Sequence, residues 1–157
     1  MYKKILVAID GSDVANGAFE TALQLAKAEK AELLPLYVVE YPNIYDPGIG
    51  YDLTPIYEAL RAEGDRVAAE ADACLKKEGI DGKARVADKF PSIRPTASQI
   101  QDVADEFQAD LVILGTHGRS GFKRLMLGSV AEAFIRQSTR PVLLIPQKAT
   151  VEPLAKE

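Results

Sequence analysis

The 157-residue chain has no tryptophan, one cysteine and one histidine, and each scarcity excludes a class of site. A single cysteine, Cys74, cannot form an intrachain disulfide, so we expect a reducing compartment. The single histidine, His117, has no second ligand at metal-binding spacing, which argues against a zinc site. His117 also has no serine and carboxylate arranged to complete a hydrolytic triad. The histidine is therefore expected to be a loop residue beside a ligand.

Long hydrophobic runs and an excess of positive charge are also missing. No apolar stretch approaches roughly 18 residues, so we expect no membrane-spanning segment and no membrane partner. The apolar part of residues 1–10 is too short for a signal peptide. The net charge is -4 and the pI about 5.1, which provides no global field that would favour nucleic acid. Together these absences predict a cytoplasmic protein.

The common phosphate-binding motifs are absent as well. The chain contains neither GxxxxGK[ST] nor GxGxxG, the glycine-rich loops of many nucleotide-binding proteins. Ser120 does not lie in a G-x-S-x-G elbow, because Phe122 stands where the second glycine would be. Any nucleotide site must therefore use a different pattern.

Short apolar segments alternate with helical patterns along the whole chain. Continuous runs of branched apolar residues are typical of strands buried on both faces, and they predict strands at 5–9, 31–39, 111–114 and 142–145. The segment 82–87 is expected to be a more polar strand nearer a sheet edge. Capping residues and apolar periodicity predict the helices between them. Their expected starts are a cap at Ser12 or Asp13, Thr54 before Pro55, a Thr96–Gln99 capping box and a Ser129–Glu132 capping box. Pro35, inside the second strand, predicts a bulge or an unpaired backbone position.

This alternation predicts an open, doubly wound α/β fold of the Rossmann-like kind. We expect a parallel five-stranded sheet in the order 3-2-1-4-5, with helices on both faces. One domain is expected over residues 1–147, followed by a flexible tail at 148–157. The segment 40–54 is long enough to be a lid. In such sheets ligands bind at the carboxyl ends of the strands, where the strand order reverses.

The stretch that follows the fourth predicted strand carries the strongest functional signal. Gly115 ends the strand, Gly118 follows, and Gly128 with Ser129 precedes the next helix. Glycines let backbone N–H groups approach a phosphate and permit positive φ, and a helix N-terminus attracts an anion. The cations between the glycines can neutralise phosphate charge; they are Arg119, Lys123 and Arg124. Alternatively, the glycines are turns, the serine is only a cap and the cations are a solvated face, but the joint spacing favours a phosphate site.

Two other predicted strand ends have open interpretations. Asp10 follows the first strand, where its carboxylate would accept from ribose hydroxyls, hold hydrated Mg²⁺, or simply cap the next helix. Val38 and Val39 end the second strand. Their backbone groups would pair with an adenine edge if a base bound there, but the residues alone favour ordinary core positions.

The spacing Gly115-x2-Gly118-x9-Gly128-Ser129 resembles the nucleotide-binding motif of the ATP-binding universal stress proteins. The similarity extends to residues 4–12, 36–40 and 128–146. It implies a doubly wound fold, a site for ATP (or AMP or ADP) with or without Mg²⁺, and a homodimer. The residues expected to bind the nucleotide are Ala8, Ile9, Asp10, Val38, Gly115, Thr116, His117, Gly118, Arg119, Gly128, Ser129 and Val130.

In that family the dimer commonly pairs the last strands of two subunits, which here implies an interface through Val142, Leu143, Leu144 and Ile145. An apolar edge strand is suited to such pairing. The segments 41–54 and 88–95 depart from the family pattern. They leave open what covers the nucleotide and whether Arg94 reaches it.

Three functions follow from these residues. The first is a homodimeric stress-response module regulated by adenine-nucleotide occupancy, with an unidentified protein partner. The second is a weak Mg²⁺-dependent ATP hydrolase or an adenylate-transferring enzyme, against which stands the lack of a residue to orient a nucleophile. The third is an interaction module that keeps the fold without nucleotide, against which stands the intact glycine spacing. We favour the first.

Overall fold

The computed structural model describes residues 1–42, 50, 52–90, 94–117 and 127–146. Within them the chain forms five strands and four helices in strict alternation, which confirms the predicted elements. The strands are β1 (Lys4–Ala8), β2 (Glu32–Val38), β3 (Arg85–Ala87), β4 (Leu111–Gly115) and β5 (Val142–Ile145). The helices are α1 (Asp13–Glu29), α2 (Thr54–Glu78), α3 (Thr96–Phe107) and α4 (Ser129–Gln137). The predicted tail at 148–157 lies outside the described residues.

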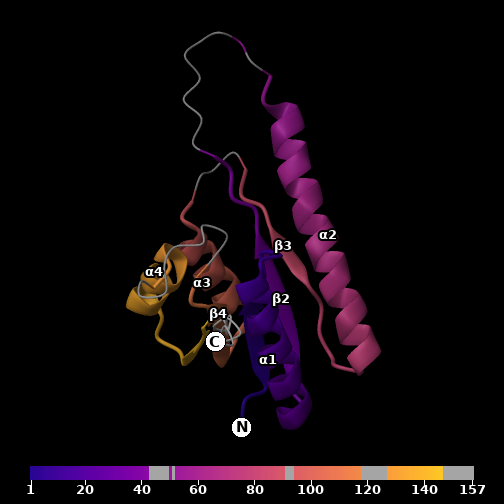
Figure 1. Cartoon of the computed structure of the whole chain (residues 1–157). Coiled ribbons are helices and arrows are strands. Elements are labelled where there is room, and N and C mark those ends of the chain that lie inside the picture. The colour runs from indigo at the N-terminus through magenta and orange to yellow at the C-terminus, as the bar shows by residue number, and fades with distance from the viewer. Residues whose placement is uncertain (43–49, 51, 91–93, 118–126, 147–157) are drawn as a thin grey trace, which may run out of the picture.

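The strands form one parallel sheet in the order β3-β2-β1-β4-β5, as predicted. Side chains alternate between the two faces of β1, so Leu6 packs with α3 and α4 while Ile5 and Val7 pack with α1. Helix α2 covers the same face as α1 farther toward β3, against Tyr37 and Val39. Figure 1 shows the helices arranged on both sides of the strands. No helix in the described ranges combines the length and the apolar character needed to cross a membrane.

Pro35 occupies a regular position in β2, opposite Val7, so the structure contains no bulge there. The N–H groups of Leu33 and Val39 donate to the carbonyls of Asp81 and Ala87, on the side of β3. Pro35 is an even number of residues from both, so the N–H that proline lacks would also point to the side of β3. The β2–β3 ladder begins only at Leu36. The proline therefore sits where no ladder hydrogen bond is needed, which agrees with the predicted unpaired position.

The helix caps differ from the prediction at three of four starts. Ser12 caps α1 as expected, since its Oγ accepts from the N–H of Ala15 over 3.3 Å. Thr54 is instead the first residue of α2, after Leu53. The two predicted capping boxes are wrong, because Thr96 and Ser129 lie one position inside their helices. The hydroxyl groups of Thr96 and Ser129 therefore do not form the helix-capping hydrogen bonds that the sequence predicts.

The backbone carbonyls of the preceding residues close these two first turns. The N–H of Gln99 donates to the carbonyl of Pro95 over 3.1 Å, and that of Glu132 donates to Gly128 over 2.9 Å. The Glu132 carboxylate pairs with Arg136 rather than reaching back to the helix start. Backbone hydrogen bonds therefore form the first turn of each helix. Thr96 and Ser129, the first residues of α3 and α4, lie at the carboxyl edge of the sheet.

Candidate functional site

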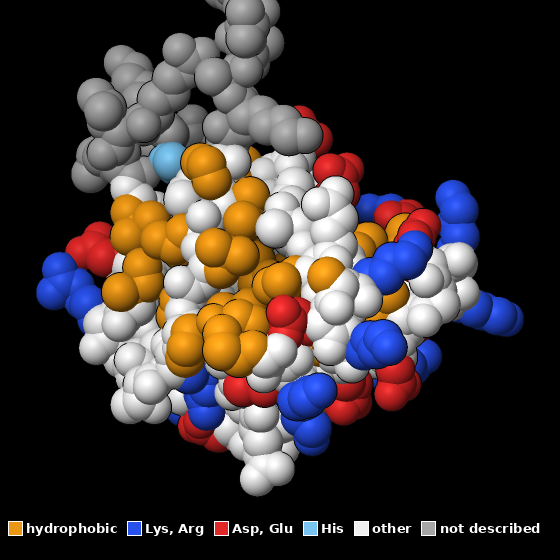
Figure 2. Space-filling model, turned by 90° about the horizontal axis from the view of Figure 1, so that it is seen from below, with side chains coloured by type: hydrophobic (Ala, Val, Ile, Leu, Met, Phe, Trp, Pro, Cys, Tyr) orange, Lys and Arg blue, Asp and Glu red, His pale blue; other side chains and the backbone are white. Residues whose placement is uncertain are grey.

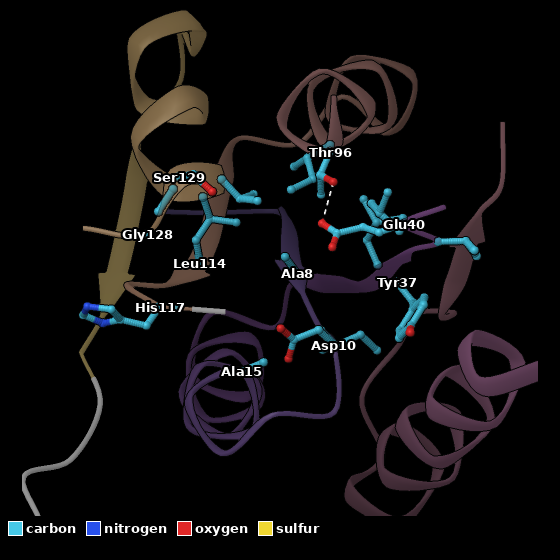
Figure 3. A pocket seen from close by; sticks show the side chains of 18 of the residues that line it. Ala8, Asp10, Ala15, Tyr37, Glu40, Thr96, Leu114, His117, Gly128 and Ser129 are labelled. Atoms are coloured by element: carbon cyan, nitrogen blue, oxygen red, sulfur yellow. Dashed lines mark hydrogen bonds between the residues drawn. The ribbon is translucent and has the colours of Figure 1, made fainter. Parts of the chain in front are cut away.

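A cavity of about 250 Å³ opens at the carboxyl ends of β1, β2 and β4. The amino-terminal ends of α3 and α4 and the start of α1 complete its wall (Figure 3). Strand β1 has β2 on one side and β4 on the other, so this is the place where the strand order reverses. Ligands of doubly wound proteins bind in this crevice. The cavity is the best formed candidate site in the described part of the chain.

The structure brings together every predicted site residue that it describes. Residues from β1, β2, the β4 end and the α4 start line the one cavity: Ala8, Ile9, Asp10, Val38, Gly115, Thr116, His117, Gly128, Ser129 and Val130. Gly118 and Arg119 lie outside the described residues, as do Lys123 and Arg124. The shared cavity supports the set as a unit, while each residue's contact with a ligand stays a prediction.

The N-terminus of α4 faces the cavity. The first N–H groups of a helix have no partner within the helix, and the helix dipole makes this end positive. Here Gly128, Ser129, Val130 and Ala131 all line the cavity. The N–H of Gly128 already donates to the carbonyl of Thr116 over 2.7 Å, which fixes this end against β4. The first-turn N–H groups after Gly128 are therefore the donors placed for an anion.

The glycines act differently from the prediction. Gly128 has an extended backbone with φ of -62°, and Gly115 is not among the glycines with positive φ, so neither needs the left-handed region. A Cβ on Gly115 would lie 2.8 Å from Cγ1 of Val14 in α1. Glycine at 115 thus lets the first turn of α1 approach β4, and its predicted approach to a phosphate stays a prediction.

Asp10 organises the turn between β1 and α1. Its Oδ1 accepts from the N–H of Ser12 over 2.8 Å, while Ser12 provides the helix cap. The alternative in which Asp10 caps the helix is therefore wrong. Its side chain projects toward the middle of the cavity (Figure 3). This position, between the α4 start and the β2 end, is suited to accepting hydrogen bonds from hydroxyl groups of a ligand.

His117 lies at the α4 end of the cavity, as expected for a loop histidine beside a ligand. Its Nδ1 and the Thr116 hydroxyl are 3.0 Å apart and form a hydrogen bond. The opposite ring nitrogen, Nε2, is buried and has no hydrogen-bond partner among the described residues. A buried unpaired ring nitrogen is costly, and a ligand oxygen or water at this end would satisfy it.

Val38 presents backbone groups to the cavity. The N–H of Ile9, just beyond β1, donates to the carbonyl of Leu36 over 2.8 Å. In a parallel strand, residues two apart direct their N–H and C=O groups to the same side. The N–H and C=O of Val38 therefore point in the same direction as those of Leu36, toward the space beyond the end of β1. The Val38 side chain packs in the core under α3 and α4. The core interpretation is therefore confirmed for the Val38 side chain, while pairing of its backbone with an adenine edge stays a prediction.

Sequence reasoning missed half of the lining. Apolar residues such as Leu36, Ile100 and Leu114 contribute to it, and they resemble any other core position in the sequence. It also missed a polar pair at the far end, where the Thr96 hydroxyl donates to Oε1 of Glu40 over 2.6 Å. The predicted capping box had assigned the Thr96 hydroxyl to its own helix. Glu40 carried no signal beyond its place after β2.

The metal chemistry of the site is limited by its donor set. Within the described ranges no three side chains of the ligand types His, Cys, Asp and Glu gather as they would around a metal ion. A Mg²⁺ ion here would be held mainly by phosphate oxygens and water, with Asp10 as a carboxylate at hand.

Comparison with known proteins identifies the family. A family model described as "Universal stress protein family" matches residues 1–146. The chain belongs to the universal stress protein family. It is 34% identical over 147 residues to a universal stress protein of Methanocaldococcus jannaschii, covering 92% of this chain and 82% of that protein.

Solved structures of the family share the fold. A family member from Burkholderia pseudomallei is 36% identical with a TM-score of 0.77, and the match covers 93% of this chain and 97% of that one. A universal stress protein crystallised in complex with cAMP is 29% identical with a TM-score of 0.61, covering 92% and 97% of the two chains. The five-stranded parallel architecture is thus shared with solved structures of the family, one of which was crystallised with cAMP.

Proposed function

We propose that this protein binds an adenine nucleotide, ATP or AMP, in the cavity at the carboxyl edge of the sheet. The observation that carries the proposal is the convergence of the described predicted residues, drawn from four elements, on one cavity with the α4 N-terminus in its wall. The relative crystallised with cAMP supports an adenine nucleotide as the ligand class.

The two ends of the cavity suggest how the nucleotide lies. Phosphate oxygens meet the first-turn N–H groups of α4, where the helix dipole favours negative charge. Ribose hydroxyls lie near Asp10, and the base lies against the backbone of Val38. His117 lies at the same end of the cavity as the proposed phosphate position.

The biological role that we propose is that of a cytoplasmic stress-response module whose interaction with a protein partner depends on nucleotide occupancy. We further propose a homodimer in which β5 of one subunit pairs with β5 of another. Figure 2 shows hydrophobic side chains gathered on one face of the molecule, and Leu143 of β5 is among the exposed large hydrophobic residues.

Isothermal titration calorimetry with ATP, AMP and adenosine tests the nucleotide proposal. Ser129→Asp adds a carboxylate at the first residue of α4, where it is compatible with the helix dipole but repels a phosphate. We expect affinity for ATP and AMP to fall about tenfold or more, and affinity for adenosine to change little.

Thr54→Asp is the matched control. It places the same charge at the exposed first residue of α2, which does not line the cavity. The parent protein and this control should bind ATP equally. Absence of binding in the parent would refute the nucleotide proposal. Steady phosphate release from ATP, lost in Asp10→Ala, would replace the regulatory role with an enzymatic one.

A further inference from the structure

The Glu40–Thr96 pair closes the cavity at the end opposite His117 and Ser129 (Figure 3). Glu40 follows β2 by two residues, and Thr96 is the first residue of α3. A second cavity of about 380 Å³ lies beyond, and Val39, Glu40 and Thr96 line both cavities. Because there is open space on both sides of the pair, these two side chains form the boundary between the two cavities. Their hydrogen-bonding groups therefore decide which ligand groups fit at this end.

The geometry of β2 directs Glu40 to this position. The Val39 N–H, just beyond β2, still donates to the carbonyl of Ala87 over 2.9 Å, so the extended course of the chain continues toward Glu40. Val38 and Glu40 are two residues apart, and such side chains lie on the same face of an extended segment. The Val38 side chain packs in the core beneath α3 and α4, and the Glu40 carboxylate accordingly meets the start of α3. Glu40 is thus the next polar group after the Val38 backbone, where the base is proposed to lie.

The carboxylate retains hydrogen-bonding capacity. Thr96 donates to Oε1, and among the residues that the structure describes no donor is recorded for Oε2. An ionised carboxylate accepts hydrogen bonds and cannot donate them. A group that carries N–H at this end of the cavity is therefore matched to Glu40, and a group that carries a carbonyl oxygen is not.

We propose that Glu40 is a specificity-determining residue that accepts a hydrogen bond from the exocyclic amino group of adenine, and that Thr96 is its positioning residue. This inference rests on the proposed nucleotide function. Hypoxanthine and guanine carry a carbonyl oxygen where adenine carries the amino group, and that oxygen would face the carboxylate. Glu40 is exposed and water also reaches its carboxylate, so the expected preference for adenine rests on one charge-assisted hydrogen bond.

The alternative is a purely structural role, in which the Glu40–Thr96 hydrogen bond only connects the end of β2 to α3. In that case its loss would disturb all ligands alike, whereas loss of a base contact changes the preference between bases. AMP and IMP provide the comparison, because they share ribose and phosphate and differ at the edge of the base.

The experiment measures dissociation constants of AMP and IMP for the parent, Glu40→Gln, Thr96→Val and Thr96→Ser. A hydrogen bond to a charged group predicts that the parent prefers AMP at least tenfold. Glu40→Gln should reduce that preference roughly tenfold, because an amide can donate to the carbonyl oxygen of IMP. Thr96→Val should reduce the preference less, and Thr96→Ser, which keeps the hydroxyl, should restore it.

Ser129→Asp is the control at the other end of the cavity, and it should weaken AMP and IMP equally. An equal loss of AMP and IMP affinity in Glu40→Gln would overturn the specificity role and leave the pair a structural tie. A parent that binds both nucleotides without preference would also overturn it. A parent that binds neither would refute the nucleotide function itself, which is a separate and distinguishable result.

Discussion

The two edges of the sheet are built in opposite ways. The β3 edge is short and charged, with Lys83 paired to Asp72 and Arg85 paired to Glu106. The β5 edge is apolar throughout, and Leu143 is 36% exposed on it. Natural sheets protect exposed edges with charges or short strands because bare apolar edges pair with other chains. The contrast between the two edges supports the proposed homodimer through β5.

The β3 edge depends on close backbone contacts within the chain. Gly82 forms a bridge with Leu33 of β2 before β3 begins. Asp72 of α2 accepts from the N–H of Ala84 over 2.7 Å and so holds the same segment from the helix side. Within the described residues, the chain itself therefore completes the β3 edge, whereas β5 pairs with β4 alone.

Gly82→Ala is the substitution expected to damage the β3 edge most. Gly82 has φ of +149°, and a Cβ would lie 1.9 Å from the carbonyl oxygen of Leu33. Neither backbone can move without breaking the bridge, so we expect a loss of about 3 kcal/mol or more in the free energy of unfolding. Urea denaturation followed by circular dichroism measures it.

Gly17→Ala is its matched control. Gly17 lies inside α1, and an added Cβ there would meet no atom within 4 Å. Higher helix propensity should stabilise the protein by about 0.5–1 kcal/mol. If both substitutions destabilise equally, the close approach at Gly82 is not the reason for the first effect.

Leu143→Lys should disrupt the β5 edge. Pairing of two such edges would bury the lysine against its symmetry mate, so we expect dimerisation to weaken about a hundredfold with little change in the fold. Analytical ultracentrifugation measures the dimer. Ile56→Lys, at a 45% exposed position on α2, is the control that should leave dimerisation unchanged. A dimer unaffected by Leu143→Lys would place the interface elsewhere.

Local patterns predicted one half of the candidate site far better than the other. The predicted strands agree with the structure because apolar runs are local signals, although the ends shift by a residue or so and β3 starts at Arg85. The α4 end of the cavity was found because Gly115, Gly128 and Ser129 are close in the sequence. The close approach of Val14 to Gly115 could not be predicted in the same way, because it exists only after α1 packs on β4.

The base end could not be found in this way. Glu40 and Thr96 are 56 positions apart, and only the sheet and α3 together make them neighbours. The capping-box pattern at Thr96 even pointed to a competing local bond. Hydroxyl residues near helix starts serve either the backbone or a distant partner, and the tertiary structure decides between them.

Gly64→Ala tests how closely α2 packs on the sheet near its β3 edge. A Cβ at 64 would lie 2.9 Å from Cδ1 of buried Tyr37. Alanine favours the helix, but the contact should outweigh that gain and leave a net loss of about 1–2 kcal/mol. In a Tyr37→Leu background, which removes the ring, Gly64→Ala should instead stabilise in urea denaturation. The same sign in both backgrounds would show that the ring contact is unimportant.

Asp88→Asn should produce the smallest change, at the carboxyl end of β3. Burial opposes the charge of Asp88, but hydrogen bonds from Phe90 N–H, the Tyr41 hydroxyl and Arg61 hold the pKa of Asp88 below its usual value. A lowered folded pKa means that the ionised carboxylate stabilises the fold above the unfolded pKa of about 3.9, and that this contribution is lost as pH falls toward the folded pKa.

We therefore expect Asp88→Asn to cost about 1 kcal/mol at pH 7, where the carboxylate of the parent is ionised and accepts all three donors. The difference between parent and variant should persist to about pH 5 and shrink below about pH 4, because the parent carboxyl then becomes protonated. Urea denaturation at several pH values measures both curves. A difference that stays constant down to pH 3 would mean that the contribution of Asp88 does not depend on its charge.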